Sequence, residues 1–150
     1  MEMIKEELYQ LCLNYADDCI HAAQQAINDA IESANDDTKS SAGDKYETGR
    51  EMMQQEIDRN RKQLDEAVKM RNILLSIDLK NNSETAQLGS IVITNLGKFY
   101  ISISRGQLAV RDDIYFAVSA ISPIGVRLIG QKKGYEFDFN GKLFKILDIC

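Results

Sequence analysis

Tryptophan is absent from this sequence, and proline and histidine occur once each. Because the single proline is Pro123, no proline interrupts a helix anywhere before it. His21 is the single histidine and no CxxC pair exists, so we expect no structural zinc site. We interpret His21 as a solvated helix residue rather than a catalytic group.

The sequence also has no long apolar run, and we expect no leader segment. No run approaches the roughly 18 apolar residues that a membrane span requires. The first residues, MEMIKEELYQ, are acidic and lack the basic and apolar parts of a secretory signal. Cys12 and Cys19 would lie about 10 Å apart on one helix, too far for a disulfide within that helix. We therefore expect a cytoplasmic protein.

Charge is distributed unevenly along the chain, whose formal net charge is −5. Residues 1–80 carry a net charge of −7, and residues 81–150 a net charge of +2. Nucleic-acid phosphates require a basic surface, so the acidic first half is not expected to bind nucleic acid directly and non-specifically.

Two long segments with helical periodicity fill the first half. Apolar residues recur at three- and four-residue steps over 3–34 and again over 44–77. Such thin stripes are stable only when buried, so we predict an antiparallel helical hairpin (a coiled coil) over residues 1–79, with its tip near 35–44. The stripes are Ile4, Leu8, Leu11, Tyr15, Cys19, Ala22, Ala26 and Ala30, then Met53, Ile57, Leu64, Ala67, Val68, Leu74 and Ile77.

After about residue 88 the period of the apolar pattern changes to two. Segments rich in β-branched and aromatic residues are typical of strands. Asn140-Gly141 lies between two of them and is a strong signal for a two-residue hairpin turn. The predicted strands occupy residues 89–95, 98–104, 114–120, 135–139 and 142–149.

One short helix is predicted among these strands. Ser122 can cap it, Pro123 suits its first position, and Gly130 can end it. The fold class is therefore α+β. The hairpin is followed, over residues 88–150, by a small antiparallel sheet with one short helix.

The stretch SPIGVRLIGQKKGYEFDF, residues 122–139, resembles the C-terminal signature of the GreA/GreB family of bacterial transcript cleavage factors. The resemblance implies an FKBP-like sheet domain and RNA polymerase as the partner. It also implies that the short helix provides a contact element on the rim of the polymerase. The matching positions that we assign to partner binding are Ser122, Pro123, Ile124, Leu128 and Gly130.

The segment Gly43-Asp44-Lys45-Tyr46-Glu47 is similar to the Gly-Asp-x-x-Glu at the coiled-coil tip of that family. The resemblance implies that Asp44 and Glu47 enter the secondary channel and help to hold the catalytic Mg²⁺ and water that hydrolyse backtracked RNA. The chain itself would then be an accessory factor, not an enzyme, with no cofactor of its own. The same two residues also fit a capping box, in which both carboxylates serve only to start the helix.

The tip also departs from the family pattern. After Glu47 the chain reads Thr48-Gly49-Arg50-Glu51, where the family continues Asn-Ala-Glu-Tyr. Three hypotheses therefore stay open. The first is stimulation of RNA cleavage, and the second is occupation of the secondary channel without cleavage. The third is a coiled-coil adaptor or chaperone-like module unrelated to polymerase.

Overall fold

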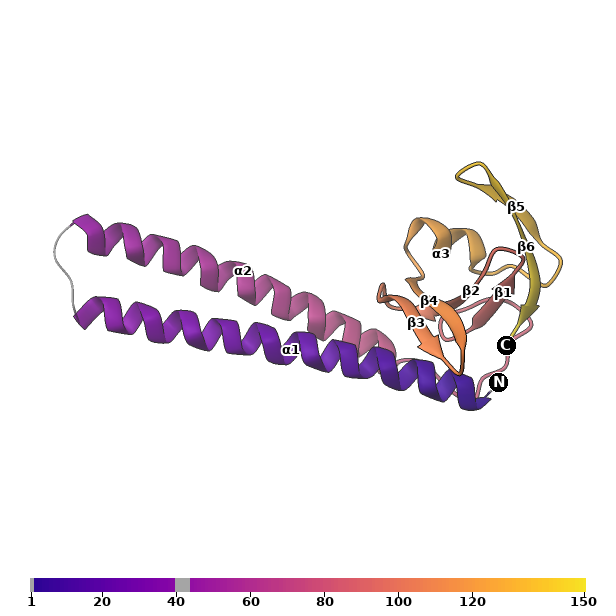
Figure 1. Ribbon diagram of the computed structural model, residues 1–150, viewed down its shortest axis with the longest axis horizontal. Helices are drawn as coiled ribbons and strands as arrows, with labels where there is room; N and C mark the ends of the chain where they lie inside the picture. The colour runs from indigo at the N-terminus through magenta and orange to yellow at the C-terminus, as the bar shows by residue number, and fades with distance from the viewer. Residues whose placement is uncertain (1, 40–43) are drawn as a thin grey trace. The chain divides into compact units, whose positions relative to one another are not determined.

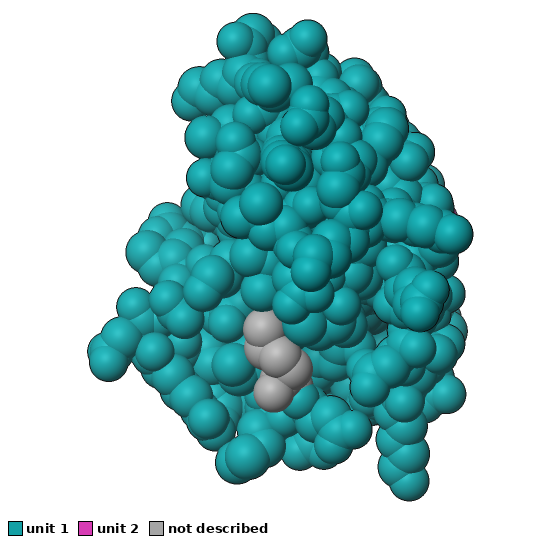
Figure 2. All heavy atoms as spheres, turned by 90° about the vertical axis from the view of Figure 1, so that its right-hand side faces the viewer, with its two compact units in different colours: residues 1–15, 72–150 teal, residues 16–71 magenta. Residues whose placement is uncertain are grey.

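The computed structural model describes the backbone of residues 2–39 and 44–150, and the side chains of residues 2–35 and 49–150. The chain divides into two compact units: unit 1 contains residues 1–15 and 72–150, and unit 2 contains residues 16–71. Figure 2 shows the surface of unit 1. The predicted boundaries follow the change in periodicity, whereas this division follows packing and assigns the start of the first helix to the sheet unit.

Two long helices form the predicted hairpin. They are α1 (Glu2–Lys39) and α2 (Asp44–Leu75), drawn in indigo to magenta in Figure 1. Helix α1 continues several residues past the predicted end of its apolar stripe, because no proline or glycine interrupts it there. None of the described helices is long and apolar enough to cross a membrane.

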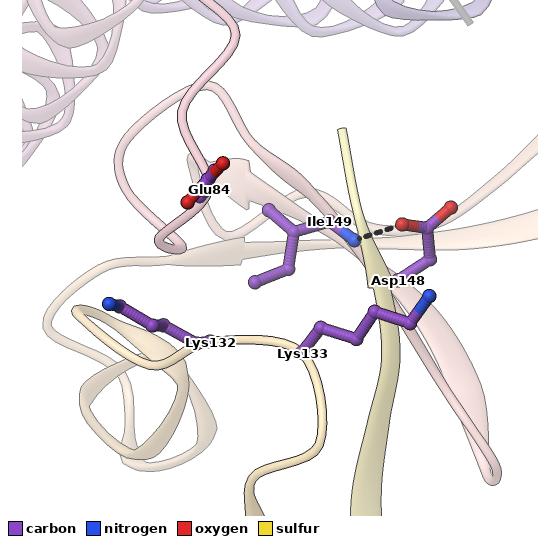
Figure 3. A pocket seen from close by; sticks show the side chains of 5 residues that line it. All are labelled: Glu84, Lys132, Lys133, Asp148 and Ile149. Atoms are coloured by element: carbon purple, nitrogen blue, oxygen red, sulfur yellow. Dashed lines mark hydrogen bonds between the residues drawn. The ribbon is translucent and has the colours of Figure 1, made fainter.

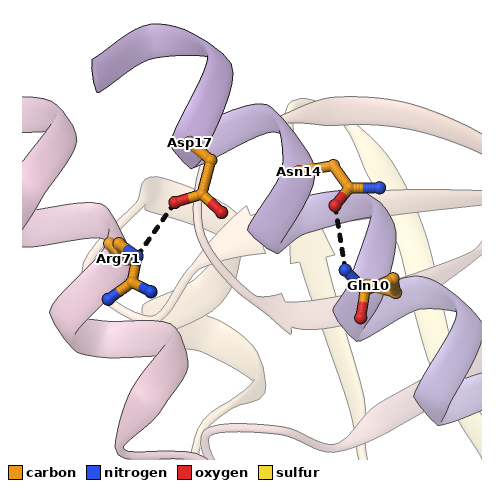
Figure 4. Close-up of polar contacts among 4 residues, drawn as sticks. All are labelled: Gln10, Asn14, Asp17 and Arg71. Atoms are coloured by element: carbon orange, nitrogen blue, oxygen red, sulfur yellow. Dashed lines mark hydrogen bonds and ion pairs between the residues drawn. The ribbon is translucent and has the colours of Figure 1, made fainter. Parts of the chain in front are cut away.

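Within unit 2 the two helices meet along a seam of small residues. The α1 side is Ala16, Ala23 and Ala30, spaced by seven as in a coiled coil, and α2 supplies Ile57, Asn60 and Ala67. An ion pair between Asp17 and Arg71, at 2.9 Å, joins the same two helices (Figure 4).

The predicted stripes are partly wrong. Leu11, Ala22 and Val68 are exposed, whereas Cys12 and Ala23 are buried. Both helices also carry apolar residues beside the buried seam. More than one set of apolar residues therefore fits the three- and four-residue spacing. Only the partner surface selects which set is buried.

The strands of unit 1 form one six-stranded sheet in the order β3-β4-β2-β1-β6-β5. Neighbouring strands are antiparallel except for β2 and β4, which are parallel. Strand β3 was not predicted. It lies at the edge, so that β4 returns between it and β2. The strands are β1 (Ile91–Thr94), β2 (Gly97–Ser102), β3 (Gly106–Val110), β4 (Asp113–Ser119), β5 (Glu136–Phe139) and β6 (Lys142–Ile149).

The two faces of the sheet are covered differently. One face carries a core that includes Ile101 and Phe144, and Leu128 of the short helix α3 (Pro123–Leu128) packs into it. Alternation along β2 directs Ser102 to the other face, where its hydroxyl lies 3.7 Å from the sulfur of Cys12 on α1. The first turns of α1 therefore cover that second face. The architecture predicted from the sequence, a hairpin followed by a sheet with one short helix, is confirmed.

Two tight turns in the sheet use positive backbone φ angles. The predicted Asn140-Gly141 turn is confirmed, with φ of 52° and 79°. The β3–β4 turn places Arg111 and Asp112 at φ of 51° and 67°, without a glycine. The guanidinium of Arg111 donates to Glu7 of α1 through Nε at 3.2 Å and Nη2 at 2.8 Å, so this turn is tied to the helix that covers the sheet.

Tyr100 is fully buried on the face covered by α1. Among the described side chains, its hydroxyl is the one buried polar atom without a hydrogen-bond partner. Burial raises the pKa of the Tyr100 hydroxyl above its ordinary value of about 10, and nearby Cys12 and Tyr9 add to that rise. The folded state therefore requires the protonated hydroxyl.

We predict that Tyr100→Phe protects the fold at alkaline pH. Below about pH 10 both folded and unfolded wild type keep the phenolic proton, so the variant should be as stable as wild type or slightly more stable. Above that pH the unfolded chain loses the proton and the folded chain keeps it, so wild-type stability falls. Urea unfolding at about pH 8 and about pH 11 measures this. An equal alkaline loss in both proteins would contradict it.

Candidate functional site

Helix α3 begins at a cap that the sequence predicted. The Ser122 hydroxyl accepts a hydrogen bond from the Gly125 N–H at 3.1 Å and donates one to the Ser119 carbonyl at 2.6 Å. Pro123 occupies the first turn, where its missing N–H leaves no intrahelical bond unmade. Gly130, at φ of 79°, follows the end of the helix. The cap fastens α3 to the end of β4.

Gly125 allows a very close approach of α3 to β4. A Cβ added at Gly125 would lie 2.0 Å from the Ser119 carbonyl oxygen. That oxygen is backbone and already accepts from the Ser122 hydroxyl, so it has little freedom to move away. The position of α3 on the sheet is thus fixed by one glycine and one serine.

The predicted contact residues divide between the core and the surface. Leu128 is fully buried and Ile124 is half-buried against the same core, so these two side chains hold α3 in place. Pro123 and Gly130 are exposed. The sequence reasoning missed the two most exposed apolar side chains of this region, Ile121 at 87% and Val126 at 56%.

Helical spacing could have indicated which residues of α3 are buried and which are exposed. Ile124 and Leu128 are four residues apart and lie on one face, so Val126, two residues from each, must lie on another. Ile121 precedes the cap and therefore lies outside the helix. We call Ile121, Pro123 and Val126 the α3 surface. It is apolar, exposed and held on a rigid support, which suits contact with another protein surface.

Aromatic side chains line the sheet face on which α3 packs. The ring centroid of Phe99 lies 5.9 Å from that of Phe116 and 6.2 Å from that of Phe144. Phe144 stacks on Phe137 at 5.2 Å, and the guanidinium of Arg127 on α3 lies 5.1 Å from the Phe137 ring. Of these rings Phe116 is the exposed one. Phe99, Phe137 and Phe144 belong to the core into which Leu128 of α3 packs.

A hollow of about 350 Å³ lies elsewhere on unit 1 and has mixed charge. Figure 3 shows Lys132 and Lys133 extending in opposite directions beside it, with Ile149 between Glu84 and Asp148. Two cations and two carboxylates leave this hollow without net charge. It therefore lacks the excess of one sign that would select a phosphate or a metal ion.

The predicted carboxylates lie at the start of α2. The backbone of Asp44 and Glu47 is within that helix, and their side chains lie outside the described residues. Among the side chains that are described, no group of three or more His, Cys, Asp or Glu could hold a metal ion. The assignment of a shared Mg²⁺ to these two residues stays a prediction.

No family model and no curated protein matches the sequence. Among solved structures the chain is similar to the transcription factor Gfh1, with 16% identity over 92% of each chain and a TM-score of 0.38.

We predict that Gly125→Ala lowers the free energy of unfolding by about 1–3 kcal/mol or more, because the new methyl group must displace the Ser119 carbonyl. Gly97→Ala is the matched control. A Cβ there would meet its nearest atoms, of Phe99 and Phe116, at 3.7 Å, an ordinary contact. Urea denaturation of both variants measures the difference. Equal stability of the two would contradict the assigned role of Gly125.

Proposed function

We propose that this chain is a Gre-like factor that docks on bacterial RNA polymerase through the α3 surface and inserts its hairpin into the secondary channel. The observation that carries the proposal is the α3 surface. The stretch that resembles the Gre signature presents exposed Val126 on a helix capped by Ser122, and exposed Ile121 directly precedes that cap. The hairpin and the small sheet domain are the other parts that such a factor needs.

The chemistry of the α3 surface favours a protein partner. Fully burying one aliphatic side chain contributes about 1.5–3 kcal/mol, so two such residues can supply a useful part of a binding energy. A nucleic-acid backbone would instead require clustered cations. On α3 itself the single basic residue is Arg127, which lies over the Phe137 ring. The channel rim of the polymerase, a protein surface, is the partner that we propose.

The hairpin has the dimensions that channel entry requires. Within unit 2, α1 contributes residues 16–39 and α2 residues 44–71, which are roughly 36 and 42 Å long at about 1.5 Å per residue. The buried residues that α1 contributes to the seam are alanines, and the hairpin is two helices wide. Such a hairpin can bring groups at its tip to an active site at the bottom of a narrow pore.

Asp44 and Glu47 are the groups that we propose to act there. Hydrolysis of a phosphodiester bond with two metal ions needs hard oxygen ligands that position Mg²⁺ and water. Positions 44 and 47 are three residues apart in α2, and helix positions at that spacing are neighbours on the helix surface. The polymerase would own the active site and the Mg²⁺. This chain would be an accessory factor acting in the cytoplasm, without a cofactor of its own.

A second candidate function is occupation of the channel without cleavage. Gly49 favours it, since a glycine within the second turn of α2 weakens the helix by about 1 kcal/mol just behind the two carboxylates. A less rigid support would position Mg²⁺ less accurately. Docking is common to both candidates, and only the outcome at the tip differs.

Cleavage of RNA in stalled, backtracked elongation complexes tests the tip. We expect wild type to accelerate cleavage, and Asp44→Ala/Glu47→Ala to lose most of that acceleration because the Mg²⁺ ligands are gone. Polymerase binding by the double variant is the control and should be unchanged. Binding without cleavage by wild type would instead establish the channel-occupying regulator, with the two carboxylates as a helix cap.

Docking has a separate test. Ile121→Asp/Val126→Asp should lower the affinity for polymerase about tenfold or more, because two charges replace the proposed apolar contact. Leu143→Asp is the matched control, since Leu143 is an apolar residue of β6 exposed to a similar extent as Val126, at 54%. Surface plasmon resonance with immobilised polymerase measures both. Absence of wild-type binding would favour the adaptor or chaperone-like module.

A further inference from the structure

A groove crosses the hairpin in the part of unit 2 next to the tip. It has a volume of about 220 Å³. For comparison, a cavity of roughly 150 Å³ lined by aliphatic and aromatic side chains can hold a benzene molecule. Both helices contribute to its walls, which are Ile31, Ala34 and Asn35 from α1 and Arg50, Met53, Gln54 and Ile57 from α2.

Among the described side chains, those beside the groove fill the seam less completely than Ala30 and Ile57 do. Ala30 and Ile57 close the seam at 5% and 7% exposure. One turn further along α1, Ala34 provides only a methyl group, and Met53 is half-buried. Ile31 is 39% exposed at the edge of the groove. Apolar walls without a filling group forfeit dispersion contacts, so a larger residue at position 34 should be tolerated or should stabilise the hairpin.

The polar residues at the rim give the groove a charge preference. Arg50 is exposed, and in the described part of the chain it makes no ion pair. The Gln54 amide instead donates to Asp58 on its own helix at 3.0 Å. An apolar groove with an exposed guanidinium at its rim is complementary to an aliphatic side chain that has a carboxylate beside it.

We propose that this groove receives an aliphatic side chain, flanked by an aspartate or glutamate, from the wall of the polymerase channel. The inference rests on the proposed function and adds a second contact on the hairpin itself. The aliphatic group would fill the space left by Ala34, and the carboxylate would pair with Arg50. Burying both groups in the complex would fix how far and at which rotation the hairpin enters, and therefore where its tip is placed.

The test fills the groove from within. Ala34→Leu should leave far-UV circular dichroism unchanged and keep or raise the melting temperature, because the new side chain occupies the apolar space. It should nevertheless weaken polymerase binding about tenfold, because the incoming side chain is excluded. If the groove is only a packing defect, Ala34→Leu would raise the stability without weakening polymerase binding, and this result would contradict the proposal.

Arg50→Gln tests the ion pair. It should weaken binding several-fold and reduce the dependence of affinity on salt, since a charged contact is lost. Arg59→Gln is the matched control, because Arg59 is exposed on the same helix and does not line the groove. Equal effects of the two substitutions would overturn the assigned role of Arg50.

The outcomes separate this inference from the proposed function. If wild type binds polymerase and Ala34→Leu binds equally well, the groove contact is wrong while docking stands. If wild type does not bind polymerase, both the groove contact and the proposed function are wrong. Sedimentation of the chain alone gives one further outcome. A dimer that Ala34→Leu abolishes would identify a second copy as the occupant and overturn the polymerase contact.

Discussion

Burial of the start of α1 against the sheet is the interaction on which the other features depend. Leu8 and Cys12 are fully buried within unit 1, on the sheet face opposite α3. Glu7 of the same helix pairs with the guanidinium of Arg111 in the β3–β4 turn. Without this helix, one whole apolar face of the sheet would be exposed to water. The same α1 continues into unit 2 and forms half of the seam there. A single unbroken helix therefore supplies core residues to both units.

Much of the fold could be predicted from local signals. The change in period, the Ser122 cap and the Asn140-Gly141 turn each depend on neighbouring residues, and each was found where the sequence placed it. What failed depends on distant partners. The opposing helix determines that the alanines spaced seven residues apart are the ones buried. Strand β3 is a short edge strand that starts at a glycine. The parallel pairing of β2 with β4 joins strands that are separated in sequence by β3, so no local pattern encodes it.

The candidate site shows the same limit at the level of single residues. Resemblance to a signature selected residues 122–130, but it did not separate the side chains that hold α3 from those that face outward. Leu128 is internal and Val126 is external, and both are aliphatic. Composition cannot distinguish them, whereas helical phase relative to the sheet can. The hairpin groove had no sequence signal at all, because an unfilled space is a property of two facing surfaces.

The close contact between Gly125 and the Ser119 carbonyl has a consequence for how such a surface can evolve. Orientation of α3 is set by Ser122 and Gly125, neither of which belongs to its exposed apolar side. Residues at positions 121 and 126 can therefore be exchanged without altering the support beneath them. Single substitutions there could change the chemistry of the exposed surface in small steps, while the sheet domain keeps its fold. Because the residues that hold α3 differ from the residues that it exposes, the fold can be kept while the exposed surface changes.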